Sequence, residues 1–321
     1  MAVEKVLVNF FLHSYSPTLP LHSGPCNNAT VLKGITGKTG IVGIFGDPVS
    51  HSLSPAMHNA VFRHHDLNYA YVPFHVTPDQ LPAAIHGLRA MKIVGVNLTI
   101  PHKQAVLPHL DEIDPQAKWI GAVNTVVNRD GRLIGYNTDG DGLVLSMRED
   151  LGLQVEGQRV AVIGTGGSAR SVVAALAAHR ADQIAILYRT LAHAQAIKSA
   201  IAQAYPTPTV AAPLSEPDDA TALLRAADVI INTTPVGMAP TIDKSPIGHL
   251  GTQWARSDQY LVDIVYAPRE TQLMKTLRPH VKAVCNGLGM LAGQGAIAFS
   301  HFTGVNAPYI EFRKEVEIHA R

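Results

Sequence analysis

Short apolar runs alternate with amphipathic segments along most of this chain, and this pattern predicts strands followed by helices. In the first half, the runs that we interpret as strands are 41–45, 69–76, 94–98, 122–127 and 133–136. Helices are expected over 54–65 and 78–89, from Pro101 onward, and over 139–150. Ser54 before Pro55 is typical of an N-cap followed by a proline at the first helical position.

The second half repeats the alternation with longer and more apolar strands. The expected strands are 159–163, 183–188, 229–231, 260–265 and 281–285, and the expected helices are 168–179, 191–204, 287–301 and 309–320. Strand–helix alternation implies a parallel sheet with right-handed crossovers. We therefore expect an α/β protein with two α/β domains, the first at 39–143 and a nucleotide-binding domain at 144–286, followed by C-terminal helices at 287–321.

The first 38 residues are interpreted as an extension. The stretch 13–40 is rich in Ser, Pro, Gly, Thr and Asn, which is typical of a loop or tail, and the folded body is expected to begin near Thr39. The apolar stretch 6–12 is too short for a membrane span, contains Asn9 and has no small-residue cleavage site after it, so we expect neither export nor a membrane anchor.

Composition and charge exclude several functional classes. The 26 basic and 25 acidic residues leave a net charge of +1, with no basic stripe, so no nucleic-acid partner is expected. The 16 histidines show no ligand spacing such as HExxH, which gives no metal site. Cys26 and Cys285 cannot build a disulfide framework, which favours a reducing, cytoplasmic location. The expected assembly is a monomer or a homodimer.

The segment Gly164-Thr165-Gly166-Gly167-Ser168-Ala169 fits the dinucleotide fingerprint G-x-G-x-x-A, with an apolar strand before it and a helix after it. Gly164 allows the tight turn, Gly166 lets the backbone approach a pyrophosphate, and Ala169 allows close packing of helix on strand. The helix N-terminus, with Gly167 and Ser168, offers free N–H groups to phosphate. A glycine-rich turn without a ligand is the alternative.

The end of the next strand bears on the choice of cofactor. A site selective for NAD usually has Asp or Glu there, bonded to the ribose 2′-hydroxyl. This chain has Arg189 and Thr190 instead, and a guanidinium beside a hydroxyl suits a 2′-phosphate. We therefore expect NADP, with NAD as the alternative and a solvated surface charge as the other interpretation of Arg189.

Polar clusters stand at the ends of strands in the first domain, where ligands bind in open α/β sheets. They are Ser52-Leu53-Ser54, Asn97 to Lys103, Gly121 to Thr125 and Asn137 to Gly140. Their hydroxyls, amides, lysine and carboxylate fit a polyhydroxylated small molecule. A pair such as Lys103 and Asp139 could shuttle the proton of an alcohol during its oxidation, and an ordinary surface salt bridge is the alternative.

With these residues in view, the chain resembles the shikimate dehydrogenase family. The matching blocks, in family order, are Gly46 to Asn59, Asn97 to Lys103, Gly121 to Thr125, Gly135 to Gly140, Gly164 to Arg170, Asn232 to Met238, Asp263 to Pro268 and Gly287 to Gln294. They cover about residues 40–302. The resemblance implies an NADP-dependent oxidoreductase of the chorismate pathway that interconverts 3-dehydroshikimate and shikimate. It also implies that the C-terminal helices pack back on the first domain.

The resemblance further implies a role for each matched position. Lys103 and Asp139 match the catalytic pair, and the residues that match the substrate site are Ser52, Ser54, Thr99, Asn124, Asp139, Tyr266 and Gln294. The resemblance places Thr234, Gly287 and Met290 near the cofactor, together with the glycine-rich turn.

Four alternatives differ in cofactor, substrate or chemistry. Tyr188 and His193 depart from the family's usual asparagine and arginine around the 2′-phosphate, which keeps NAD open. The serines at 52 and 54 favour shikimate, and a quinate or dual quinate/shikimate dehydrogenase is the nearest alternative. A non-catalytic dinucleotide-binding regulator is an alternative from another class, and such a protein would have lost Lys103 or Asp139. A methylene-tetrahydrofolate dehydrogenase is a further alternative, and the Ser52-Leu53-Ser54 block argues against it.

Overall fold

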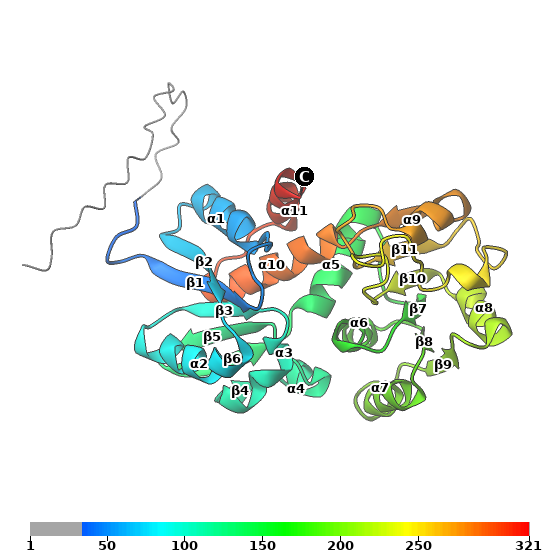
Figure 1. Ribbon diagram of the computed structural model, residues 1–321, viewed down its shortest axis with the longest axis horizontal. Helices are drawn as coiled ribbons and strands as arrows, with labels where there is room; N and C mark the ends of the chain where they lie inside the picture. The colour runs from blue at the N-terminus through cyan, green and yellow to red at the C-terminus, as the bar shows by residue number, and fades with distance from the viewer. Residues whose placement is uncertain (1–33, 321) are drawn as a thin grey trace, which may run out of the picture. The chain divides into compact units, whose positions relative to one another are not determined.

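The computed structural model describes residues 34–320. Within this range, the strands form two six-stranded sheets, and helices cover both faces of each (Figure 1). The expectations for a leader, a tail and Cys26 fall on residues 1–33 and lie outside the described residues. Residues 34–39 contain a turn but no helix or strand, and the first strand begins at Gly40, next to the expected Thr39.

The first sheet has the strand order β2-β1-β3-β5-β6-β4. Its strands are β1 (Gly40–Gly46), β2 (Tyr69–His75), β3 (Gly95–Leu98), β4 (Glu112–Ile113), β5 (Thr125–Arg129) and β6 (Arg132–Tyr136). Strand β1 is parallel to β2 and β3, but β5 runs antiparallel to both β3 and β6. This sheet is therefore mixed, and its antiparallel part includes the two strands predicted on either side of the 128–131 turn. The short Asn128–Gly131 turn joins β5 to β6 as a hairpin, and a hairpin forces antiparallel strands.

Two groups of helices cover this sheet. Helix α1 (Ser54–His64) packs on one face with α10 (Leu288–Thr303) and α11 (Tyr309–His319), sharing an apolar cluster with β1 and β2. The C-terminal helices therefore pack back on the first sheet, as the resemblance implied. The other face is covered by the helices η1 (Pro78–Gln80), α2 (Leu81–Ala90), α3 (His102–Ala105), η2 (Leu107–His109) and α4 (Pro115–Ile120).

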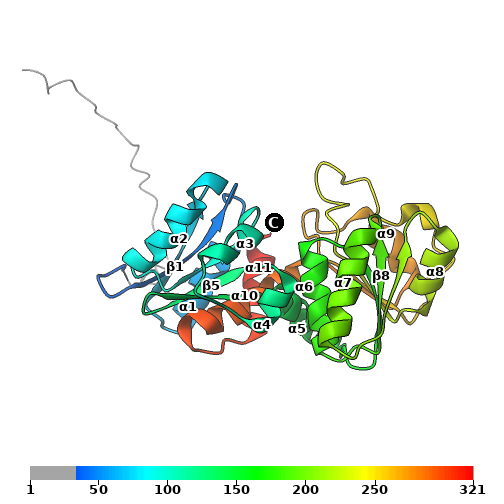
Figure 2. The same cartoon turned by 90° about the horizontal axis from the view of Figure 1, so that it is seen from below.

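The second sheet is parallel throughout, as predicted, in the order β12-β11-β10-β7-β8-β9. Its strands are β7 (Arg159–Ile163), β8 (Gln183–Tyr188), β9 (Thr209–Pro213), β10 (Val229–Asn232), β11 (Tyr260–Asp263) and β12 (Ala283–Cys285). Helices α6 (Gly167–Ala178) and α7 (Leu191–Ala204) pack on one face, with α8 (Pro217–Ala226), α9 (Gln272–Leu277) and η3 (Gly248–Leu250) on the other and η4 (Arg278–His280) following α9 (Figure 2). Successive strand residues alternate between these two clusters, as the pleat requires.

Helix α5 (Asp139–Leu151) leads from the first sheet to the second and lies beside α10 (Figure 1). The two helices meet backbone to backbone. A Cβ on Gly142 would lie 2.3 Å from the backbone nitrogen of Gln294, and a Cβ on Gly293 would lie 2.2 Å from the carbonyl oxygen of Gly142. On its opposite side, Gly140 lets α5 approach α6, with Ser171 O only 2.1 Å from its hypothetical Cβ. Glycine at these positions fixes where Asp139 and Gln294 stand relative to each other.

The structure differs from the sequence-based predictions of local structure in two respects. Ser54 is the first residue of α1 and not its N-cap; the cap is Leu53, and Ser52 Oγ accepts a bond from the Ser54 N–H over 3.3 Å. The sequence pattern also missed short elements, namely α4, β4, β9, α8 and α9. The six-residue helices α4 and α9 and the two-residue strand β4 carry too few apolar positions to show a period.

Candidate active site

A cavity of about 230 Å³ lies where the strands of the first sheet end. Every residue predicted as catalytic or substrate-binding lines it: Ser52, Ser54, Thr99, Lys103, Asn124, Asp139, Tyr266 and Gln294. Of the residues predicted to contact the cofactor, Ser168, Gly287 and Met290 line it as well. The four polar clusters thus meet at one place, although Ser52 and Asp139 are 87 positions apart, because β1, β3, β5 and β6 are neighbours in the sheet.

Lys103 is placed by the segment that follows β3. The Thr99 N–H donates to Phe45 O on β1 over 3.0 Å, which keeps the chain beside the sheet after the strand ends. In α3, the buried His102 ring nitrogen Nε2 donates to Val76 O over 2.7 Å. The Lys103 carbonyl then accepts the Val123 N–H over 2.8 Å. These bonds anchor a one-turn helix that would not be stable alone.

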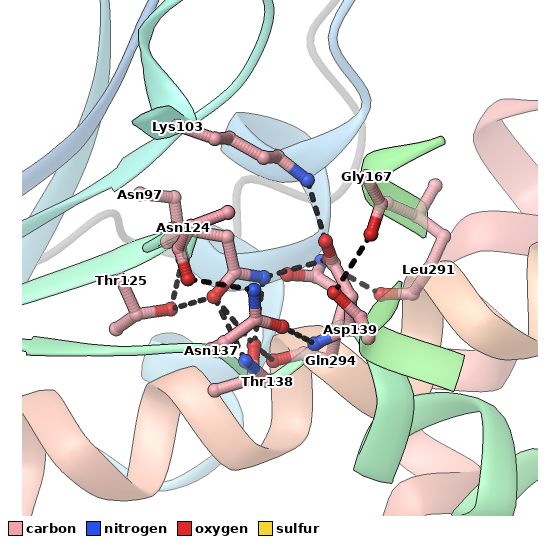
Figure 3. A network of polar contacts seen from close by, with 12 residues as sticks. Asn97, Lys103, Asn124, Thr125, Asn137, Thr138, Asp139, Gly167, Leu291 and Gln294 are labelled. Atoms are coloured by element: carbon pink, nitrogen blue, oxygen red, sulfur yellow. Dashed lines mark hydrogen bonds and ion pairs between the residues drawn. The ribbon is translucent and has the colours of Figure 1, made fainter. Parts of the chain in front are cut away.

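Lys103 Nζ donates to Asp139 Oδ2 over 2.6 Å (Figure 3). The Asp139 side chain is 10% exposed and that of Lys103 is 31% exposed. Asp139 begins α5, where the positive end of the helix dipole favours a carboxylate. Its other oxygen, Oδ1, accepts from Asn124 Nδ2 over 2.7 Å. The pair is therefore anchored on the carboxylate side, and the ammonium reaches into the cavity.

Asn124 is itself held from several sides (Figure 3). Its Oδ1 accepts the Thr138 backbone N–H over 2.9 Å and the Thr125 hydroxyl over 3.0 Å. The Thr138 hydroxyl meets Asn124 Nδ2 at 3.0 Å and Gln294 O at 3.2 Å. Because Asn124 is only 2% exposed, this amide is a fixed part of the floor of the cavity.

Further hydroxyl and amide groups line the cavity beside the Lys–Asp pair. Ser52 lies in the turn between β1 and α1, and Ser54 is the first residue of α1. Gln294 stands on α10, where its Nε2 donates to Leu291 O over 3.0 Å. Tyr266 follows β11, and burial raises the pKa of its phenol, which keeps that group neutral near pH 7. A small ligand with several hydroxyl groups would find several hydrogen-bond donors and acceptors in this cavity.

The glycine-rich turn has the features that pyrophosphate binding needs. Gly164 has φ of +114°, and a Cβ there would lie 2.8 Å from Thr233 Oγ1, so only glycine suits this turn. No atom lies within 4 Å of the hypothetical Cβ of Gly166, which leaves open space for a ligand against the backbone. Gly166 is also the N-cap of α6 and supplies no side-chain cap, so the first N–H groups of the helix stay available. Ala169 is fully buried against the sheet, as expected.

Arg189 and Thr190 come directly after β8, as predicted, and both are exposed. Thr190 is the N-cap of α7 without a side-chain cap bond. Arg189 has no hydrogen bond or ion pair among the described residues. His193 is exposed in the first turn of α7. The guanidinium and the hydroxyl are therefore free to meet an anion at this helix N-terminus.

The remaining predicted cofactor residues rest on a buried network. The Thr234 hydroxyl donates to Asn232 Oδ1 over 2.8 Å, and Asn232 Nδ2 donates to Asp263 Oδ1 over 2.9 Å. Burial raises the pKa of Asp263, although bonds from Thr271, Val265 and Asn232 oppose this effect. A Cβ on Gly287 would lie 1.9 Å from Ile264 O, so glycine lets the chain enter α10 close to the end of β11.

Sequence reasoning gave no role to several residues of the cavity. Asn97 and His51 lie inside the motif blocks but were not singled out; Val49, Leu53 and Ile264 add apolar walls. The signal that could have identified Asn97 is a polar residue near the end of the predicted apolar strand 94–98.

Among the described residues, no group of three or more His, Cys, Asp or Glu could hold a metal ion. No helix in that range is long and apolar enough to cross a membrane.

The comparisons with known proteins agree on one family. Residues 44–126 match "Shikimate dehydrogenase substrate binding domain", 147–282 match "Shikimate / quinate 5-dehydrogenase", and 287–317 match "Shikimate 5'-dehydrogenase C-terminal domain". The shikimate dehydrogenase (NADP(+)) of Halothermothrix orenii is 44% identical over 268 residues, covering 83% of this chain and 92% of the relative.

Solved structures show the same likeness. The shikimate 5-dehydrogenase of Listeria monocytogenes, in complex with shikimate and NAD, has a TM-score of 0.84 at 30% identity, covering 89% of this chain and 99% of the other. A shikimate dehydrogenase in complex with NADP+ has a TM-score of 0.81 at 39% identity, covering 93% of this chain and 100% of the other. With relatives this similar over nearly their whole length, and with its polar clusters gathered around a Lys–Asp pair, this chain belongs to the shikimate dehydrogenase family.

Proposed function

We propose that this protein is an NADP-dependent shikimate dehydrogenase that reversibly reduces 3-dehydroshikimate to shikimate. The observation that carries the proposal is the Lys103–Asp139 pair, 2.6 Å apart, in a hydroxyl- and amide-lined cavity that Gly287 and Met290 also line. The likeness to relatives named NADP(+)-dependent shikimate dehydrogenases supports both the substrate and the cofactor.

The residues fit a dinucleotide at the glycine-rich turn. The open space at Gly166 and the uncapped N-terminus of α6 would hold the pyrophosphate, and Arg189 with Thr190 would meet the 2′-phosphate of NADP. Gly167, Ser168 and Thr234 would complete the site. When bound, NADP exchanges a hydride with the ring carbon of the substrate.

Lys103 is the residue that transfers the proton. In the oxidation, the Lys103 amine takes the proton of the ring hydroxyl as the hydride leaves the same carbon; in the reduction, its ammonium returns a proton to the developing alkoxide. Asp139 holds Nζ in place and neutralises its charge when it is protonated. Ser52 and Ser54 would bind the substrate carboxylate, while Thr99, Asn124 and Gln294 would hold the ring hydroxyls, with Tyr266 beside them.

The division into a substrate domain of 39–143 plus 287–321 and a cofactor domain of 144–286 belongs to the same proposal. The separate sheets, one within residues 40–136 and one within 159–285, support it. A cytoplasmic location and a monomeric or homodimeric state also stay predictions.

The closest rival function is a quinate or dual quinate/shikimate dehydrogenase. Quinate carries a further hydroxyl on the carbon that bears the carboxylate, and a pocket discriminates such a group through space and pairing. A non-catalytic regulator is disfavoured by the intact Lys103–Asp139 pair.

The test is the initial rate of alcohol oxidation at alkaline pH, followed by the absorbance of the reduced cofactor. Shikimate and quinate are each combined with NADP and with NAD. We expect the highest kcat/KM for shikimate with NADP. A preference for quinate or for NAD would move the protein to the rival function, and no turnover with any combination would refute the dehydrogenase proposal.

A further inference from the structure

A chain of buried hydrogen bonds leads from Tyr71 to Asp139 beneath the cavity. Tyr71 lies on β2, is 3% exposed and does not line the cavity. Its hydroxyl bonds to Asn97 Oδ1 over 2.7 Å. Asn97 Nδ2 bonds to Thr125 Oγ1 over 3.0 Å, and Thr125 Oγ1 to Asn124 Oδ1 over 3.0 Å. Asn124 Nδ2 then meets Asp139 Oδ1 at 2.7 Å (Figure 3).

Two backbone groups determine the direction of every bond in this chain. The Asn124 carbonyl can only accept, so the Asn97 atom 3.2 Å away must be its NH₂ group, and the atom facing Tyr71 must be its oxygen. The Thr138 backbone N–H can only donate, so the Asn124 atom 2.9 Å away must be its oxygen, and the NH₂ group faces Asp139.

It follows that all donors point the same way. Tyr71 must donate to Asn97, Asn97 to Thr125, Thr125 to Asn124, and Asn124 to Asp139. The Tyr71 hydroxyl has one hydrogen, and Asn97 Oδ1 receives it. Hydrogen bonds aligned in series polarise one another, and here the aligned donors end on the carboxylate that holds Lys103.

We infer that Tyr71 is a positioning residue for the reaction: through Asn97, Thr125 and Asn124 it holds the Asp139 carboxylate oriented toward Lys103. The inference rests on the proposed function, since it concerns the same Lys103–Asp139 pair.

The surroundings of Tyr71 favour this role over simple packing. The His58 ring stacks on the Tyr71 ring with centroids 4.4 Å apart, and the Asn59 side chain bonds to both the N–H and the carbonyl of Tyr71. Ring and backbone are therefore held independently of the hydroxyl. Removing only the hydroxyl should leave the fold intact and break the chain at one known link.

The test compares Tyr71→Phe with Tyr69→Phe. Tyr69 is also on β2, and its ring stacks on Phe62, but its hydroxyl has no hydrogen bond among the described residues. For Tyr71→Phe we expect kcat for shikimate oxidation to fall about five- to ten-fold, with KM for NADP unchanged and KM for shikimate changed less than about two-fold. Tyr69→Phe should match the wild type. Equal kcat values in Tyr71→Phe and Tyr69→Phe would overturn the inference.

A second variant breaks the chain at another link and covers the case in which Tyr71→Phe folds poorly. Thr125→Val removes the buried hydroxyl between Asn97 and Asn124, and the loss of kcat should be similar. The double variant Tyr71→Phe/Thr125→Val should lose no more than the larger single effect, because one break already interrupts the chain. Additive losses would mean two unrelated packing defects and would refute the positioning role.

A readout that does not depend on turnover separates this inference from the proposed function. In the wild type, NMR should show slow hydrogen exchange of the side-chain amide protons of Asn97 and Asn124, and exchange should be faster in Tyr71→Phe but not in Tyr69→Phe. A wild-type protein that shows this exchange pattern but oxidises neither shikimate nor quinate would refute the proposed function alone. An active wild type whose amide protons exchange equally in both variants would refute the inference alone.

Discussion

Gly293 of α10 lies against Gly142 of α5 so closely that a Cβ on Gly293 would be 2.2 Å from the Gly142 carbonyl oxygen. The atoms that would clash belong to the backbone, which cannot turn aside as a flexible side chain can. This contact brings Gln294, the next residue on α10, to the cavity that Asp139 lines from the first turn of α5.

Substitution at this crossing should therefore disturb both stability and the site. For Gly293→Ala we expect the free energy of unfolding to fall by about 1–3 kcal/mol, because the added methyl group must push the two helices apart. Shikimate turnover should fall with it, since Gln294 moves. Urea unfolding and steady-state kinetics measure the two effects.

The matched control is Gly87→Ala in α2, where the added Cβ meets only the flexible end of Met91, 3.1 Å away. That change should be neutral or stabilising by up to about 1 kcal/mol, because alanine favours helix over glycine. Equal stability of the two variants would show that the α5–α10 crossing tolerates a wider separation.

The proton-transfer role of Lys103 makes a kinetic prediction. Lys103→Ala should lower kcat by about 10²- to 10⁴-fold with little change in KM, because binding groups remain and only the proton donor and acceptor is lost. Steady-state rates in both directions of the reaction measure this. Lys118→Ala serves as the control, because Lys118 lies on α4 and does not line the cavity. Near-normal turnover of Lys103→Ala would refute the role.

Substitutions at two glycines of the nucleotide turn should have different effects, one on stability and the other on cofactor binding. Gly164→Ala places a Cβ at φ of +114° and against Thr233 Oγ1, so it should lower the melting temperature. Gly166→Val points its side chain into open space, so it should leave the melting temperature nearly unchanged and weaken NADP binding at least about ten-fold. Thermal unfolding and nucleotide fluorescence titration distinguish the two, and tight NADP binding by Gly166→Val would contradict a pyrophosphate at this turn.

His58 should make stability depend on pH. It is fully buried, neither ring nitrogen has a hydrogen-bond partner, and burial lowers its pKa from 6.5 to about 3. Below pH 6.5 the unfolded chain therefore takes up a proton that the folded chain does not, and the free energy of unfolding falls by up to about 1.4 kcal/mol per pH unit. Its neighbours, such as Phe62 and Phe299, are apolar.

The test is urea unfolding between pH 7 and pH 5, where the carboxyl groups with lowered pKa values have hardly begun to protonate. His58→Phe should show a flatter dependence than the wild type. His86→Gln, on the exposed side of α2, should keep the wild-type slope. Parallel curves for the wild type and His58→Phe would mean that His58 is protonated in the folded state.

Much of the fold was predictable because its signals are local. The apolar runs at 159–163 and 183–188 became β7 and β8 with the same limits, and α7 begins and ends at the predicted residues. The position of Arg189 directly after β8 was also predictable, because it depends only on where that apolar run ends. The edge strand β9 was missed because only one of its five residues is buried, so it lacks a continuous apolar run. The position of Ser54 relative to the helix start depends on how the turn after β1 folds.

By itself, the sequence determined where strands and helices alternate, where the glycine-rich turn lies and which residue types follow each strand, since neighbouring residues alone decide these features. Only the tertiary structure decided that β5 runs antiparallel to β3, that α10 crosses α5 at paired glycines, and that Tyr71 reaches Asp139 through three side chains. These features depend on strand order and register between segments distant in sequence. No local pattern encodes that register, because the packing of the whole core selects it.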